Sequence, residues 1–141
     1  MIQFLSRSVG ETEDFAAAFA ARLRPGDLVA CRGGMGMGKT AFARGLARGL
    51  GLTDEVSSPT FALVHEYTHG NIPLYHFDMY RVSGFDELYS TGFFDYLEGP
   101  GVLFIEWSEN VAGALPENAV TLTITRAGEN ERELTIEGEG L

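Results

Sequence analysis

The chain has 141 residues, of which 45% are hydrophobic and 21% are charged, and its formal net charge is −10. These proportions are typical of one soluble globular domain spanning residues 1–141, and no apolar run approaches the ~20 residues of a membrane-spanning helix. The charge is uneven, with a net +3 over residues 1–48 and −10 over residues 82–141. Because such a surface repels a nucleic-acid backbone, we do not expect the chain to bind RNA or DNA on its own.

The N-terminal half predicts two strands and two helices. In chain order these are a strand over 1–6, a helix over 11–23, a strand over 28–31 and a helix over 39–50. The first helix follows from Phe15, Phe19 and Leu23, which recur at helical spacing. The second strand is an apolar run that leads directly into a glycine-rich segment.

The C-terminal half predicts mainly strands. They cover 61–67, 72–78, 102–105, 120–124 and 134–136, with one short helix at 85–89. The last two strands read as a hairpin that turns at 128–130. We interpret the acidic residues 129–139 as a solvated strand edge, with a docking surface for a basic partner as the alternative. The pattern as a whole predicts an α/β domain with a mixed sheet.

The single cysteine, Cys31, excludes an internal disulfide and is typical of a reducing cytoplasm. Its apolar surroundings at residues 28–31 predict a small buried side chain. The first seven residues lack the basic start and the long apolar stretch of a signal peptide. We therefore expect a cytoplasmic protein.

Residues 33–40 match the phosphate-loop pattern G-x-x-x-x-G-K-[ST] without a mismatch. Lys39 is the only lysine in the chain, and the other nine cations are arginines. Glycines let successive backbone N–H groups face an anion, the lysine follows the β- and γ-phosphates, and Thr40 is suited to ligate Mg²⁺. The expected nucleotide-binding residues are Gly33, Gly34, Met35, Gly36, Met37, Gly38, Lys39, Thr40 and Ala41.

The order of strand, glycine loop and helix is the context that this motif requires. The predicted fold class is therefore α/β, a single-domain phosphate-loop NTPase fold with a mixed, mainly parallel central sheet flanked by helices. The expected ligands are ATP or ADP and Mg²⁺.

Two predicted strands end on a carboxylate, Asp78 and Glu106. Ligands of nucleotide-binding α/β sheets lie beyond the carboxyl ends of the strands, where an acid can hold Mg²⁺ or orient the attacking water. His76 lies on the same strand face as Asp78 and is open to bonding that acid, contacting a partner or simply packing. The loop at 57–61, which contains Thr60, fits either a switch segment that meets the γ-phosphate or an ordinary polar turn.

These residues together resemble the bacterial TsaE (YjeE) family, the ATPase component of tRNA threonylcarbamoyladenosine biosynthesis. The resemblance covers nearly the whole chain. It rests on 33–40, on Ser58-Pro59-Thr60-Phe61 followed by Tyr67, on His76-Phe77-Asp78-Met79-Tyr80-Arg81, and on Ile105-Glu106-Trp107. The family pattern usually has Leu and Ala where this chain has Met35 and Met37, and because an anion is bound there by the backbone we expect little consequence.

The resemblance implies catalytic roles for Lys39, Thr60, Asp78 and Glu106. Thr40, Asp78 and Glu106 become the expected metal ligands, with Asp78 acting as a Walker-B-like acid and Glu106 as a ligand or a water-positioning group. Residues 58–60 become a switch-like loop, and Trp107 becomes a neighbour of the site. The resemblance also points to Thr12 as a contact of the adenine.

The resemblance further implies slow, partner-dependent ATP hydrolysis that supports a TsaB–TsaD heterodimer in forming threonylcarbamoyladenosine at position 37 of tRNAs that read codons beginning with adenine. A small-molecule kinase is the alternative, but such enzymes usually have an arginine-rich lid, and residues 82–125 contain no lysine or arginine. A guanine-nucleotide switch would need a second lysine for its Asn-Lys-x-Asp motif, which this chain lacks.

Overall fold

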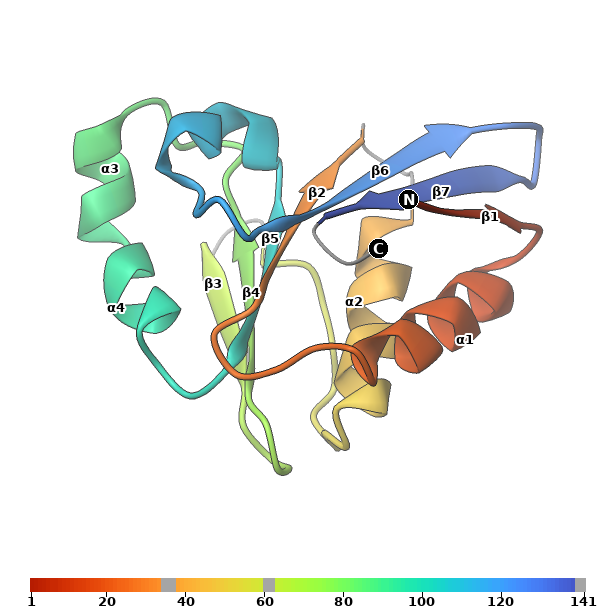
Figure 1. Ribbon diagram of the computed structural model, residues 1–141, viewed down its shortest axis with the longest axis horizontal. Coiled ribbons are helices and arrows are strands. Elements are labelled where there is room, and N and C mark those ends of the chain that lie inside the picture. The colour runs from red at the N-terminus through yellow and green to blue at the C-terminus, as the bar shows by residue number, and fades with distance from the viewer. Residues whose placement is uncertain (34–37, 60–62, 139–141) are drawn as a thin grey trace.

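A seven-stranded sheet forms the centre of the molecule (Figure 1). The structure is a computed structural model that describes residues 1–33, 38–59 and 63–138. The strand order is β1-β7-β6-β2-β5-β4-β3. The strands are β1 (Ile2–Ser6), β2 (Leu28–Arg32), β3 (Val64–Tyr67), β4 (Leu74–Asp78), β5 (Val102–Glu106), β6 (Val120–Arg126) and β7 (Arg132–Glu137).

Parallel pairing is confined to the middle of the sheet, where β6, β2, β5 and β4 run in the same direction. The outer pairs β1/β7, β7/β6 and β3/β4 are antiparallel. Parallel strands that are covered on both faces are apolar along their whole length, which is why β5 reads Val-Leu-Phe-Ile in sequence. The predicted α/β class with a mixed sheet is confirmed.

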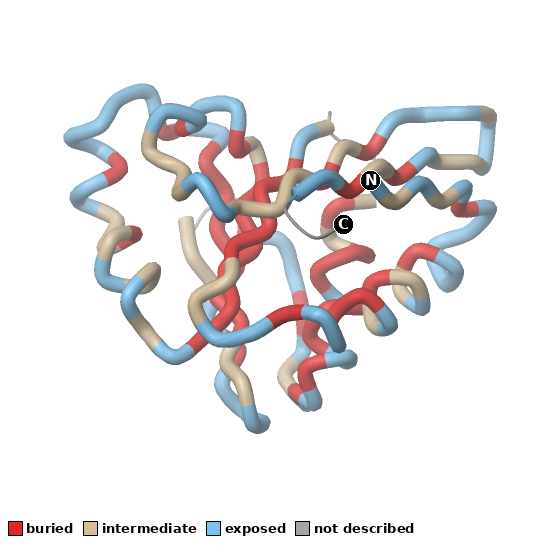
Figure 2. The backbone as a smooth tube through the Cα atoms, in the orientation of Figure 1, coloured by how far each residue is buried: buried red, intermediate tan, exposed pale blue. Residues whose placement is uncertain are grey.

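Helices cover both faces of the sheet. The helices α1 (Val9–Ala20) and α2 (Lys39–Gly49) pack on one face, and α3 (Phe85–Ser90), α4 (Phe93–Leu97) and the 3₁₀ segment η1 (Ser108–Ala114) pack on the other. Alternate residues of one strand enter the two cores, as with Val29 on the α2 side and Leu28 on the α3 side. Figure 2 shows the central strands as a nearly continuous buried band. Within the described part of the chain, no helix is long and apolar enough to cross a membrane.

The close packing of α1 against α2 depends on glycine. A Cβ atom built on Gly45 would lie 2.3 Å from the carbonyl oxygen of Glu13 and 2.6 Å from the Cβ of Ala16, both in α1. Gly49 meets Ala17 and Ala20 in the same way, one helical turn further on. The backbones of the two helices therefore touch where glycine faces alanine.

Gly45→Ala is expected to lower the free energy of unfolding by about 1–3 kcal/mol, because the added methyl forces the helices apart. Gly10→Ala in α1 is the matched control, since its Cβ would meet only the Ser8 hydroxyl at 3.8 Å. The control should be neutral or stabilising by about 0.5–1 kcal/mol. Urea unfolding of both variants measures the difference, and an equal stability of the two would contradict this view of the helix contact.

The element boundaries differ from the sequence prediction in places that local chemistry explains. Helix α1 begins at Val9 because the Ser8 hydroxyl caps it, accepting a hydrogen bond of 3.0 Å from the Glu11 N–H. Of the strand expected over 61–67, residues 61 and 62 lie outside the described residues, Leu63 has a positive φ of 69°, and β3 begins at Val64. Helices α4 and η1 were not predicted from the sequence.

The interpretation of the acidic residues 129–139 as a strand edge is wrong. The strand that they include, β7, lies between β1 and β6 and is paired on both sides. Its carboxylates at Glu133 and Glu137 remain exposed because they alternate with the buried Leu134 and Ile136. Acidic side chains on the solvent face of an inner strand give the same sequence pattern as an edge.

Candidate functional site

The segment between β2 and α2 has the backbone that its glycines predict at both described ends. Gly33 has φ +141° and Gly38 has φ +95°, regions that residues with side chains rarely adopt. Gly38 is the N-cap of α2 and has no side chain with which to cap that end. The first N–H groups of α2 and the positive end of its dipole are therefore offered to an anion. The predicted residues Gly34, Met35, Gly36 and Met37 lie outside the described residues.

Lys39 begins α2 and is buried, with only 6% of its surface exposed. Among the described residues, none accepts a hydrogen bond from its Nζ. The ammonium lies 3.9 Å from the centroid of the Trp107 ring, a cation–π contact that partly offsets the cost of burying a charge. An ammonium in this situation is completed by an anion, so the chemistry of the site fits a phosphate group. Thr40 follows as the second, partly buried residue of α2.

The two predicted acids lie side by side. Asp78 and Glu106 are the last residues of β4 and β5, they are partners in the parallel ladder, and they are 5% and 6% exposed. Cys31 of β2 is the neighbour of Glu106 on its other side. Three parallel strands thus end in one row beside the start of α2, where the sequence analysis expected the ligand.

Cys31 has no chemical role that its environment supports. Burial raises the pKa of the Cys31 thiol far above its usual range, and the nearby Lys39 ammonium only partly opposes this effect. The thiol therefore stays protonated and is a weak nucleophile. The predicted small buried side chain is confirmed.

The two acids have different partners. Oδ1 of Asp78 accepts a hydrogen bond of 2.9 Å from the Tyr80 N–H, which holds the turn after β4. Oε2 of Glu106 lies 2.5 Å from Nε2 of His76, and that imidazole is completely buried. Three alternatives were open for His76 from the sequence: bonding to Asp78, contact with a partner, or packing. The imidazole is buried in the core, and the acid that it contacts is Glu106 on the neighbouring strand.

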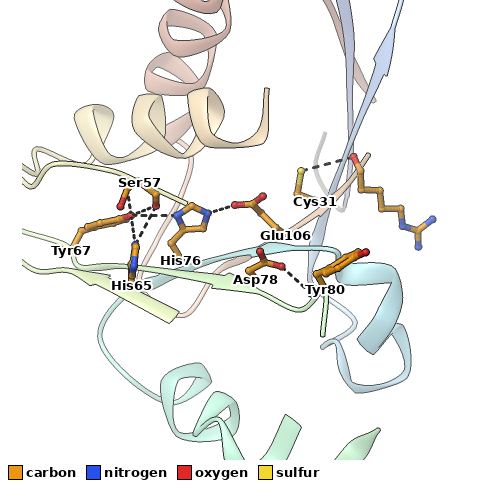
Figure 3. A network of polar contacts seen from close by, with 9 residues as sticks. Cys31, Ser57, His65, Tyr67, His76, Asp78, Tyr80 and Glu106 are labelled. Atoms are coloured by element: carbon orange, nitrogen blue, oxygen red, sulfur yellow. Dashed lines mark hydrogen bonds and ion pairs between the residues drawn. The ribbon is translucent and has the colours of Figure 1, made fainter. Parts of the chain in front are cut away.

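A chain of contacts continues from His76 to the surface (Figure 3). The Tyr67 hydroxyl lies 3.4 Å from Nδ1 of His76 and donates a hydrogen bond of 2.9 Å to the Ser57 carbonyl. The Ser57 N–H in turn donates to the same hydroxyl at 3.3 Å, and Nδ1 of His65 contacts both Ser57 and Tyr67. The sequence analysis singled out the loop at 57–61, Tyr67 and His76 but had no means of connecting them. Thr60, the predicted switch residue, lies outside the described residues.

Trp107, the residue after Glu106, has an unusual backbone. Its φ of 58° lies in the left-handed region, which among the described residues other than glycine only Leu63 shares. Such strain persists where packing maintains it and clusters at functional sites. Here the conformation accompanies an indole that contacts both Lys39 and the Tyr80 ring, the latter at a centroid distance of 4.9 Å.

An open pocket of about 420 Å³ adjoins the start of α2. Three of the predicted nucleotide-binding residues, Thr12, Gly38 and Ala41, share this pocket although they come from separate segments. The Thr12 hydroxyl lies 2.6 Å from that of Ser6, inside the pocket wall. The lining residues that sequence reasoning missed are Ser6, Arg7, Ser8, Val9, Glu129, Asn130 and Arg132. The lining residues from the β6–β7 hairpin could not be predicted from the sequence, because the hairpin lies near α2 only as a result of the strand order in the sheet.

Comparison with known proteins agrees with this arrangement. The family model described as "Threonylcarbamoyl adenosine biosynthesis protein TsaE" matches residues 6–134. The chain belongs to the TsaE family. A TsaE of Bacillus subtilis is 42% identical over 130 residues, which is 92% of this chain and 81% of that protein. A TsaE of Treponema pallidum is 39% identical over 132 residues, covering 94% and 97% of the two chains.

The fold of the TsaE family extends to a solved structure. The crystal structure of YdiB from Bacillus subtilis superposes with a TM-score of 0.82 at 37% sequence identity, covering 99% of this chain and 86% of that one. Its agreement with the mixed sheet confirms the predicted fold class. The resemblance stated from the four sequence motifs is likewise confirmed. The curated relatives are named as tRNA threonylcarbamoyladenosine biosynthesis proteins.

Proposed function

We propose that the chain binds ATP with Mg²⁺ and hydrolyses it slowly in support of tRNA threonylcarbamoyladenosine biosynthesis. The observation that best supports this function is the buried Lys39 ammonium, which lacks a hydrogen-bond acceptor among the described residues. It is the only lysine in the chain, and it begins a helix whose N-cap residue, Gly38, has no side chain. A triphosphate supplies the missing acceptors and suits the positive end of the helix.

We assign the residues of the site to nucleotide binding or to metal binding and hydrolysis, according to their chemistry. Lys39 and the first N–H groups of α2 bind the phosphates, and the pocket that contains Thr12, Gly38 and Ala41 receives the nucleoside. The oxygens of Thr40, Asp78 and Glu106 are of the kind that Mg²⁺ prefers. These residues would hold a magnesium ion, whose chemistry there would be to neutralise phosphate charge. In this proposal, the acid that does not ligate the metal orients the attacking water.

Hydrolysis by the chain alone should be slow. Residues 82–125 contain no lysine or arginine, so this segment adds no cation to balance the charge that develops on the γ-phosphate. The same feature disfavours the small-molecule kinase, which would close a cationic lid over its substrates. We propose that a partner accelerates turnover, and that this partner is a TsaB–TsaD heterodimer.

Steady-state ATP hydrolysis with and without a TsaB–TsaD pair tests the function. The expected result is slow turnover alone and an increase of about tenfold or more with the pair, the range in which a partner's catalytic contribution is measurable. A parallel titration with GTP should give weaker binding than ATP, because the chain lacks the lysine of the guanine-reading motif. Fast hydrolysis that the pair leaves unchanged would contradict the proposal.

A further inference from the structure

The buried imidazole of His76 connects two parts of the protein that are far apart in sequence. On one side its Nε2 lies 2.5 Å from Oε2 of Glu106 at the end of β5. On the other side its Nδ1 faces the hydroxyl of Tyr67, in β3. Figure 3 shows the imidazole between these two side chains. A residue that only filled space would not need polar contacts at both ring nitrogens.

The position of the ring is set by packing as well as by hydrogen bonds. The His76 ring lies between Tyr67 and Phe104, at centroid distances of 6.1 and 5.4 Å. Its side chain is completely buried, so the ring cannot turn without moving its neighbours. A shift of the Tyr67 ring is therefore passed on to the imidazole and from there to the Glu106 carboxylate.

The outer end of this chain is accessible. Ser57 is exposed, and its backbone exchanges two hydrogen bonds with the Tyr67 hydroxyl, accepting one at its carbonyl and donating one from its N–H. The inner end is the Glu106 carboxylate, which is 6% exposed. Between them lie only Tyr67 and His76, so the path from the surface to the acid is short and polar throughout.

We propose that Tyr67 and His76 are positioning residues that couple the backbone of Ser57 to the orientation of the Glu106 carboxylate. A contact that displaces Ser57 at the surface then changes the geometry of the acid and with it the rate of nucleotide hydrolysis. The effect on hydrolysis rests on the proposed function, whereas the coupling itself concerns the protein without nucleotide.

Tyr67→Phe tests the coupling, because it removes one oxygen and keeps the ring. Turnover of ATP should fall about fivefold, the size of effect expected when one hydrogen bond that supports the position of Glu106 is lost, while the dissociation constant for ADP stays within about twofold. Tyr96→Phe is the matched control, since it deletes a hydroxyl that donates to Glu66 and belongs to a ring packed against the opposite core from Tyr67. It should change neither quantity.

A pair of His76 variants separates the two ring nitrogens. His76→Gln keeps a donor near the position of Nε2, whereas His76→Asn keeps a polar atom only near the position of Nδ1. We expect His76→Gln to retain more turnover than His76→Asn, because it can still bond Glu106. In the double variant Tyr67→Phe/Glu106→Gln, the Tyr67 change should add nothing to the loss caused by Glu106→Gln alone.

Fluorescence of Trp107, the only tryptophan, gives a readout without nucleotide. Acrylamide quenching of Trp107 should increase in Tyr67→Phe and remain at the wild-type level in Tyr96→Phe. Equal quenching and equal turnover in these two variants would overturn the coupling, and so would additive losses in the double variant. If the wild-type protein hydrolyses no ATP, the proposed function fails, and the quenching comparison still decides the coupling by itself.

Discussion

Replacing Lys39 with methionine is expected to weaken the binding of ATP and ADP by about 100-fold or more. The ammonium is buried, and a charge-assisted hydrogen bond to phosphate contributes about 1.5–3 kcal/mol, so loss of two such bonds accounts for this factor. Methionine keeps the length of the side chain and its contact with the Trp107 ring. Isothermal titration with Mg²⁺–ADP measures the affinity, and urea unfolding checks that the fold is retained.

Arg44→Met is the matched control for this experiment. Arg44 lies on the same helix, its guanidinium is exposed, and it pairs at 3.8 Å with Glu13 of α1. Its loss should leave nucleotide binding unchanged, because an exposed ion pair contributes little and lies on the α1 side of the helix. The variant Lys39→Arg should also bind nucleotide weakly, since a planar guanidinium does not replace the slim ammonium of lysine. An unchanged nucleotide affinity in Lys39→Met would contradict the proposal that Lys39 binds phosphate.

The parts of the site that could be predicted from sequence are those determined by local chemistry. The glycines at positions 33 and 38 indicate a backbone that other residues rarely adopt, and both have a positive φ in the structure. The acids Asp78 and Glu106 were found because each ends an apolar strand, and parallel strands present their carboxyl ends at one edge. Neither inference needed to know which strands are neighbours.

The contacts that were missed depend on sheet order and register. His76 bonds Glu106 because β4 and β5 are adjacent and paired so that Asp78 lies opposite Glu106, a fact that no periodicity in either strand contains. The same holds for Asn130 and the rest of the β6–β7 turn, which reach the pocket at α2 only through the position of β7 between β1 and β6. Sequence identifies candidate side chains at such sites, but only the assembled sheet identifies their partners.

The contact between Lys39 and Trp107 illustrates a third case. The resemblance to the family placed Trp107 near the site, yet its role in burying the ammonium follows from the left-handed φ of 58° directly after β5. No sequence pattern predicts a bulky residue in the left-handed region, because residues with large side chains rarely adopt a positive φ. The strain is consistent with a site whose aromatic wall is held in place by the fold rather than by local propensity.

Glu106→Gln is expected to lower ATP turnover by about 100-fold or more while changing the affinity for ADP by less than about threefold. The amide has the size of the carboxylate, and its oxygen can still accept the hydrogen bond from Nε2 of His76. The variant therefore removes the negative charge and leaves the contact with His76 in place. Single-turnover hydrolysis at saturating Mg²⁺ measures the loss.

The dependence of this loss on Mg²⁺ distinguishes the two roles open to Glu106. A metal ligand that is weakened should be partly rescued by raising the Mg²⁺ concentration, whereas a group that orients water leaves the rate low at any concentration. Glu109→Gln supplies the control, since it makes the same change in an exposed side chain three residues further along. Asp78→Asn should likewise impair turnover more than binding, because it alters the neighbouring acid of the same strand pair. Normal turnover in both Glu106→Gln and Asp78→Asn would show that the row of acids beside α2 does not perform the hydrolysis.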